Sequence, residues 1–143
     1  MSRKDKGHFG TKHEGVPLNA DIAAELRGRA RSGGLSCAEA EGIAKKMKAA
    51  MKDIGVAMDL SEIRIERCQL GLFGDESGKK AVKPLDHVPD ALRLSIEKAL
   101  SSGRLPCVEA WRIAREQGLP RMDVSSACEA LGIKVSACQL GAF

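Results

Sequence analysis

An internal repeat constrains the fold of this chain more than any other feature of its sequence. Shifting the sequence by 70 residues aligns residues 20–73 with residues 90–143 without a gap, and 16 of the 54 pairs are identical. The identities fall at a Ser-Gly pair, at apolar positions with helical spacing and in a shared ending, CQLGxF. Because self-similarity at one offset marks a repeated structural unit, we expect two related units.

The repeat divides the chain into four segments. Residues 16–74 are expected to form the first unit and residues 88–143 the second, and each begins with a Val-Pro pair. Residues 75–87 are rich in Gly, Lys, Asp and Pro, which predicts an exposed linker. Residues 1–15 carry four basic residues and no apolar period, which predicts a mobile basic arm. Units this small are near the lower limit for independent folding, which favours packing on each other or dimerisation.

Composition indicates what the core is made of and where the protein is found. Three Phe, one Trp and no Tyr leave the core to aliphatic side chains, which favours helix-rich packing. The same scarcity argues against modules that stack single-stranded bases on aromatic side chains. No apolar run approaches the roughly 20 residues needed to span a bilayer, and no export signal precedes the first unit. We therefore expect a cytoplasmic protein with no membrane partner.

The second unit has clear signals for three helices. The expected starts are Asp90, Pro106 and Pro120, and the expected ends are Gly103, Gly118 and Gly132. Residues 133–138 begin with alternating apolar and polar side chains, which predicts one short strand. The predicted fold class is therefore mainly α, with two repeated three-helix units that each end in a short β-strand.

The corner between the second and third helices resembles the helix-turn-helix motif of bacterial DNA-binding regulators. The motif's apolar, small and glycine positions are filled here by Ile113, Ala114, Gly118, Leu119, Val124 and, weakly, Ala127. A small residue lets the helices cross closely, and Gly takes the positive φ angle of the corner. With the strand that follows, the unit is similar to a winged-helix domain with a reduced wing.

The resemblance implies that the third helix enters the major groove of double-stranded DNA. The residues it implies at bases and phosphates are Arg121, Ser125, Ser126, Glu129 and, beyond the helix, Lys134. One such helix contacts few bases, so a homodimer acting as a transcriptional regulator is expected. The alternative is that Arg121 and Ser125 only solvate a surface helix.

The first unit departs from this pattern at its corner. Lys48 stands where the second unit has Gly118, and KKMKAAMKDIG contains no helix breaker, so the two helices are expected to run together. Met47, Met51, Ile54 and Met58 form an apolar stripe that is either core or an interface. Lys48 and Lys52, with Lys45 and Lys46 beside them, are candidates for holding DNA phosphates.

The five Cys are expected to be reduced and to act as small buried hydrophobic residues. Cys37 matches Cys107 and Cys68 matches Cys138, but no close CxxC spacing indicates zinc. His8, His13 and His87 complete no ligand set, so no metal or other cofactor is expected. A thiol switch or a metal centre remains the alternative.

Function is expected to be binding rather than catalysis. No phosphate loop, GxSxG or helical His pair is present, which predicts no enzyme. The net charge of +4 permits DNA binding without requiring it. The expected function is therefore a DNA-binding transcriptional regulator. The alternatives are a protein-interaction module on a helix-turn-helix scaffold and a cysteine-based redox or metal sensor.

Overall fold

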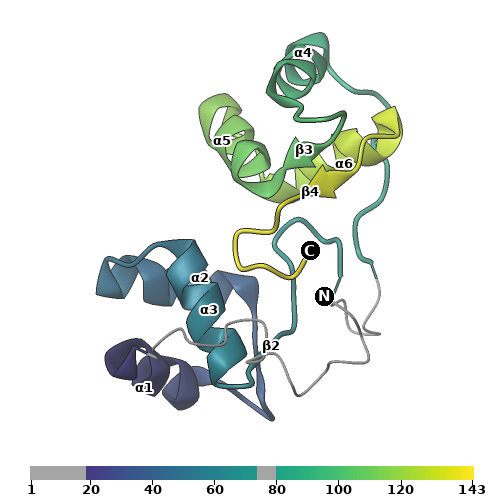
Figure 1. The fold of residues 1–143 in the computed structure, drawn as a ribbon. Coiled ribbons are helices and arrows are strands. Elements are labelled where there is room, and N and C mark those ends of the chain that lie inside the picture. The colour runs from purple at the N-terminus through teal and green to yellow at the C-terminus, as the bar shows by residue number, and fades with distance from the viewer. Residues whose placement is uncertain (1–18, 74–79) are drawn as a thin grey trace. The chain divides into compact units, whose positions relative to one another are not determined.

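The computed structural model describes residues 19–73 and 80–143 and is mainly α (Figure 1). These residues form six helices and four two-residue strands, and the strands make two separate parallel sheets. The chain divides into two compact units. Unit 1 contains the residues up to Cys68 together with Gln139–Ala142, and unit 2 contains Gln69–Cys138 and Phe143. The arm expected over residues 1–15 lies outside the described residues.

Unit 1 alternates helices with very short strands. Its elements are α1 (Ala20–Arg29), β1 (Gly34–Leu35), α2 (Cys37–Met47), α3 (Met51–Leu60) and β2 (Arg64–Ile65). The Asn19 side chain accepts hydrogen bonds from the N–H groups of Asp21 and Ile22, which fixes the start of α1. Ser36 accepts a hydrogen bond from the N–H of Glu39 and starts α2 in the same way.

Unit 2 repeats the same order of elements. They are α4 (Asp90–Ala99), β3 (Leu105–Pro106), α5 (Cys107–Gln117), α6 (Arg121–Leu131) and β4 (Val135–Ser136). Pro89, Pro106 and Pro120 are the N-cap residues of the three helices, and none is assisted by a capping side chain. The expected start at Asp90 is confirmed, whereas Pro106 and Pro120 each lie one residue before the first residue of the helix. Proline's fixed φ angle sets the chain direction before each helix.

Both units turn sharply between the second and third helices. Gly118 ends α5 at φ 65°, and Lys48 ends α2 at φ 53°. The corners share two hydrogen bonds. The first runs from Ala49 N–H to the Ala44 carbonyl and from Leu119 N–H to the Ala114 carbonyl, each at 2.9 Å, and the second from Lys48 N–H to Lys45 and from Gly118 N–H to Arg115, each at 3.4 Å. The prediction that the second and third helices of the first unit run together is therefore wrong. Lys48 adopts the left-handed conformation without the freedom of Gly, at a cost of roughly 1 kcal/mol.

The strands differ from the prediction in number and partner. The strand expected over residues 133–138 is β4, only two residues long, and it pairs with β3, which the sequence did not predict. A matched strand pair, β1 with β2, forms in unit 1. The Ser-Gly pairs at 32–33 and 102–103 have positive φ at both residues, and these turns lead the chain into β1 and β3.

Aliphatic side chains fill the core of each unit, as composition predicts. Leu26, Ile43, Ile54 and Met58 are fully buried in unit 1, as are Ile96, Ile113 and Val124 in unit 2. Four of the five Cys are buried, and Cys138 is partly exposed. Burial raises the pKa of the Cys128 thiol to about 11. The buried Cys therefore act as hydrophobic residues, as expected.

The shared CQLGxF endings are anchored by leucine. Leu70 in unit 2 and Leu140 in unit 1 are 0% and 3% exposed. Gly71 and Gly141 turn the chain at φ 73° and 84°. The Phe73 and Phe143 rings meet edge to face, but Phe143 is 41% exposed. Leucine, rather than phenylalanine, is the buried anchor of each ending.

Candidate functional site

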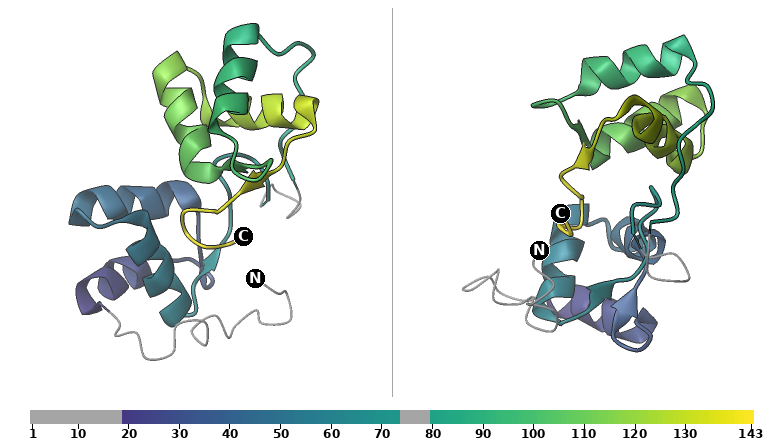
Figure 2. Two further views of the ribbon diagram at one scale, coloured as in Figure 1. Left: turned by 45° about the horizontal axis from the view of Figure 1, so that its top comes forward. Right: turned by 90° about the vertical axis from the view of Figure 1, so that its right-hand side faces the viewer.

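Two of the residues expected to face DNA are buried in α6. Ser125 is 1% exposed and Ser126 is 9% exposed, so the expectation that both point outward is wrong. The segment before α4 runs past α6 (Figures 1 and 2) and contacts it at Ser126. The Leu85 N–H donates a hydrogen bond to the Ser126 carbonyl oxygen at 3.1 Å. Both serine side chains are thus withdrawn from solvent.

Two charged side chains of α6, Arg121 and Glu129, are held by partners within unit 2. The Arg121 guanidinium lies 3.7 Å above the Trp111 ring and donates a hydrogen bond to Gln69 Oε1 at 2.9 Å. Glu129 forms an ion pair with Lys80. A cation on an aromatic face contributes about 0.5–2 kcal/mol, which favours this placement of Arg121. Trp111 is partly exposed and serves as the platform for Arg121.

The Gln-Leu-Gly endings lie against the third helix of each unit. In unit 2, a Cβ atom on Gly71 would lie 2.9 Å from Met122 Cε. In unit 1, a Cβ atom on Gly55 would overlap the Leu140 carbonyl group. The matched endings of the repeat, Leu140 and Gly71, thus each approach the third helix of one unit, at Gly55 of α3 and at Met122 of α6.

The expected linker is partly packed. Val82 is 6% exposed, and its N–H donates a hydrogen bond to the Gly71 carbonyl oxygen at 3.0 Å. The prediction of an exposed linker over residues 75–87 is therefore wrong at Val82, while residues 74–79 lie outside the described part of the chain. With Gln69–Phe73, residues 80–85 form a segment that we call the α6 cover.

The remaining candidate residues are exposed lysines. Lys48 at the corner, Lys52 on α3 and Lys134 before β4 are exposed and form no ion pair with the described residues. Lys45 and Lys46 are paired with Glu41 and Glu25. Thus three of the seven residues expected at DNA remain available to phosphate. Lys48 and Lys52 come from unit 1 and Lys134 from unit 2.

Unit 1 has an open groove beside α3 that the sequence did not predict. It has a volume of about 490 Å³ and lies among the start of α1, the corner at Lys48 and one side of α3. The apolar lining comes mainly from Ile22, Met47, Val56 and Leu60, and the carboxylates from Asp21 and Asp53. Met47 of the apolar stripe therefore lines a surface, whereas Ile54 and Met58 are core. We call this feature the unit 1 groove.

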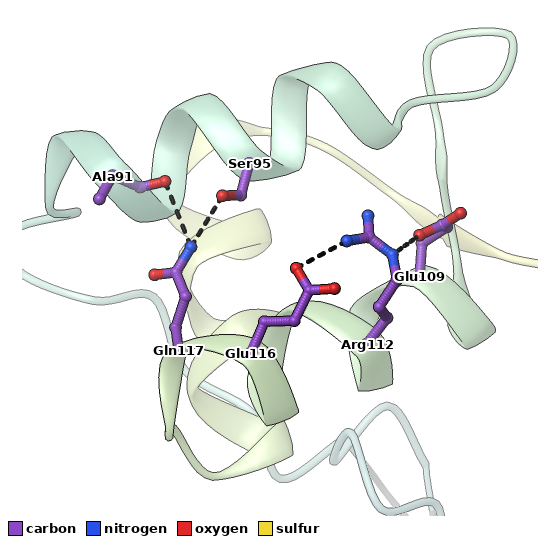
Figure 3. Close-up of polar contacts among 6 residues, drawn as sticks. All are labelled: Ala91, Ser95, Glu109, Arg112, Glu116 and Gln117. Atoms are coloured by element: carbon purple, nitrogen blue, oxygen red, sulfur yellow. Dashed lines mark hydrogen bonds and ion pairs between the residues drawn. The ribbon is translucent and has the colours of Figure 1, made fainter.

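In unit 2, the residue that matches Met47 is Gln117, and its side chain makes hydrogen bonds within the unit. Figure 3 shows the Gln117 side-chain amide donating to Ser95 Oγ at 2.7 Å and to the Ala91 carbonyl oxygen at 3.4 Å. These bonds tie the end of α5 to α4. Beside them on α5, Arg112 is paired with Glu109 and Glu116 (Figure 3). Gln117 thus holds the end of α5 against α4 by polar contacts within unit 2.

The described residues give little support to a metal or membrane role. Across residues 19–73 and 80–143, no cluster of three His, Cys, Asp or Glu side chains could hold a metal ion. His8 and His13 lie outside this part of the chain, and His87 is exposed. In the same ranges, every helix is too short or too polar to cross a bilayer.

Comparison with protein-family models, curated proteins and solved structures finds no match to this chain. The candidate site therefore depends on its geometry alone. Sequence reasoning missed Gln69 and Leu70 as cover residues, although their identity with Gln139 and Leu140 was a visible signal. It also missed the unit 1 groove, whose walls come from three separate elements.

Proposed function

We propose that this chain is a protein-interaction module built on two tandem helix-turn-helix units that are similar to reduced winged helices. The observation that carries the proposal is the covered third helix. On α6, all five residues from Val124 to Cys128 are buried. A duplex reader needs the outward side chains of this helix at base edges, and here they face the chain itself.

Electrostatics supports the same proposal. Two of the four arginine side chains on the helices of unit 2 are neutralised locally, Arg93 by Glu97 and Arg112 by Glu109. Affinity for DNA grows with the number of phosphates that free cations neutralise. Arg93 and Arg112 are therefore not available as free cations for a duplex.

The proposal is tested by selecting peptides against the full chain from a displayed random library. We expect enriched sequences that bind saturably in calorimetry, with dissociation constants of about 1–100 µM, as is common for one extended segment in one groove. The Leu94→Asp variant, changed at an exposed α4 residue, serves as a control. Failure to enrich any sequence, together with tight binding to duplex DNA, would contradict the proposal.

A second candidate is DNA binding through phosphates, with regulation of transcription as its outcome and a homodimer as the binding form. The observation that favours it is the exposure of Lys48, Lys52 and Lys134 without ion pairs to described residues. In this candidate the lysines hold the backbone, and Arg121 and Ser125 read no bases. Fluorescence anisotropy of a duplex as a function of salt tests it. The change of Lys48 and Lys52 to Ala should reduce the salt slope by about 2 if both hold phosphates, and an unchanged slope would exclude them.

A further inference from the structure

We infer that the unit 1 groove is the docking site for an extended peptide segment of a partner protein, with an aliphatic side chain next to a basic one. This inference rests on the proposed interaction function and names the chemistry of the partner. The volume of about 490 Å³ falls in the range of about 300–1,000 Å³ that is typical of binding sites, and the lining combines apolar side chains with four polar ones, Asn19, Asp21, Lys48 and Asp53.

Unit 2 already holds an extended segment at the place that corresponds to the unit 1 groove. Val56 of the groove matches Ser126 of α6, and there Leu85, in an extended segment, donates its N–H to the Ser126 carbonyl. Leu85 is half-buried and Val82 is buried in the same segment. The corresponding side of the third helix thus accepts an extended chain with aliphatic anchors in one unit. In the other unit, the described residues leave it open.

Differences between the repeats explain why the groove exists. Met47 replaces Gln117, whose amide ties α5 to α4 in unit 2. A methionine side chain makes no such bonds, and its flexibility suits an adaptable apolar surface. Val56 and Leu60 replace Ser126 and Ala130, which widens the apolar wall. Each change favours an apolar ligand at this place.

The charged residues at the rim of the groove favour a peptide with a basic side chain next to its aliphatic one. Asp21 and Asp53 are exposed and form no ion pair with the described residues, and Lys48 is the one cation among the lining residues. Two carboxylates against one ammonium group leave an excess negative charge. A lysine or arginine beside the anchor of the peptide would neutralise it, with the modest gain that an exposed pair provides.

The experiment uses a capped synthetic peptide, KAVKPLDHVP, which copies residues 80–89, and the isotope-labelled full chain followed by NMR. We expect amide shifts centred on residues 47–56 and saturation in the micromolar to millimolar range. A peptide with Asp in place of its Leu should bind at least tenfold more weakly, because the anchor no longer fits an apolar wall. Shifts confined to α6 would overturn the inference, because the peptide would then only exchange with the segment it copies.

Variants at matched positions of the two units test whether the peptide binds in the unit 1 groove. Asp53→Asn should weaken peptide binding by about two- to fivefold at low salt, whereas Asp123→Asn at the matched position of unit 2 should leave it unchanged. Val56→Asp should weaken binding more than tenfold. Equal effects of the two Asn variants, or an unaffected Val56→Asp variant, would overturn the assignment.

The remaining outcomes separate the possible occupants. A chain that begins at Asn19 should bind the peptide with the same affinity as the full chain. Binding only after the removal of residues 1–18 would overturn the assignment to a partner, because the chain would then compete for its own groove. Selected peptides that bind outside the unit 1 groove would overturn this inference alone. A tight and sequence-specific duplex complex would overturn the proposed function as well.

Discussion

The third helices α3 and α6 occupy the same place in the repeat but differ in how far they are enclosed. Each is covered on one face by a Leu-Gly segment, Leu140 at Gly55 in unit 1 and Gly71 at Met122 in unit 2. On α6, residues up to Leu85 also cover the next face, whereas the unit 1 groove lies beside α3. The comparison teaches that the duplication kept the residues that cover the helix and changed those that border the groove.

The leucine anchors give the largest expected effect and test whether the covers are equivalent. Leu140→Ala and Leu70→Ala should each lower the free energy of unfolding by about 3–4 kcal/mol, because both side chains are fully enclosed. Urea denaturation measures the change. Leu94→Ala, at a residue 47% exposed, is the control and should cost under about 1 kcal/mol. A small effect at either anchor would show that its ending does not cover the helix.

The matched pair Gly55 and Ser125 tests how closely the cover approaches. Gly to Ala inside a helix normally stabilises by about 1 kcal/mol, but Gly55→Ala should destabilise by about 2 kcal/mol because the new Cβ overlaps the Leu140 carbonyl. Ser125→Ala should be neutral or stabilising, since the Ser125 hydroxyl is buried with no hydrogen-bond partner among the described residues. A stabilised Gly55→Ala variant would mean that Leu140 does not lie there in solution.

The Cys128 thiol predicts a pH dependence of stability that comes from unit 2, because the matched residue in unit 1, Met58, does not titrate. Because desolvation raises the pKa of the Cys128 thiol from 9.0 to about 11, the folded state holds the proton more tightly than the unfolded state. The resulting contribution to the free energy of unfolding is fully present below pH 9 and is lost as the pH rises towards 11. We expect a loss of about 1 kcal/mol between pH 9 and 10, which a Cys128→Ala variant would not show. Equal slopes in both proteins would place the thiol in water.

The corners give the smallest effect and test the strain at Lys48. Lys48→Gly should stabilise the protein by about 0.5–1 kcal/mol, and Gly118→Lys should destabilise it by about the same amount, because both positions have positive φ. Thermal unfolding of the two variants against the parent measures both changes. If Lys48→Gly instead destabilises, a contact of the lysine side chain must outweigh the backbone strain.

Local signals in the sequence predicted the helices well. Pro106, Gly118, Pro120 and Gly132 mark boundaries that the structure confirms within a residue, because each acts through its own φ angle. The Lys48 corner was missed because local propensity favoured a continuous helix, although Ala44 and Ala114 matched across the repeat. The tertiary packing of α2 on α3 overrides that propensity.

The candidate site was much less predictable. Sequence periodicity marks which residues avoid water, but it does not say which later segment covers them. Ser125 and Ser126 are small polar residues and were expected at the surface, yet they fit where the chain approaches closely. The unit 1 groove could not be predicted because α1, the corner and α3 meet only in the folded unit.

The most direct test of the covered third helix is a selection of duplex DNA from a random pool by the full chain, carried out at about 150 mM salt. We expect no consensus sequence to be enriched, and only weak binding that disappears as the salt concentration rises. Enrichment of a consensus whose binding is lost in the Arg121→Ala and Ser126→Ala variants would contradict the account, because those side chains would then reach the bases.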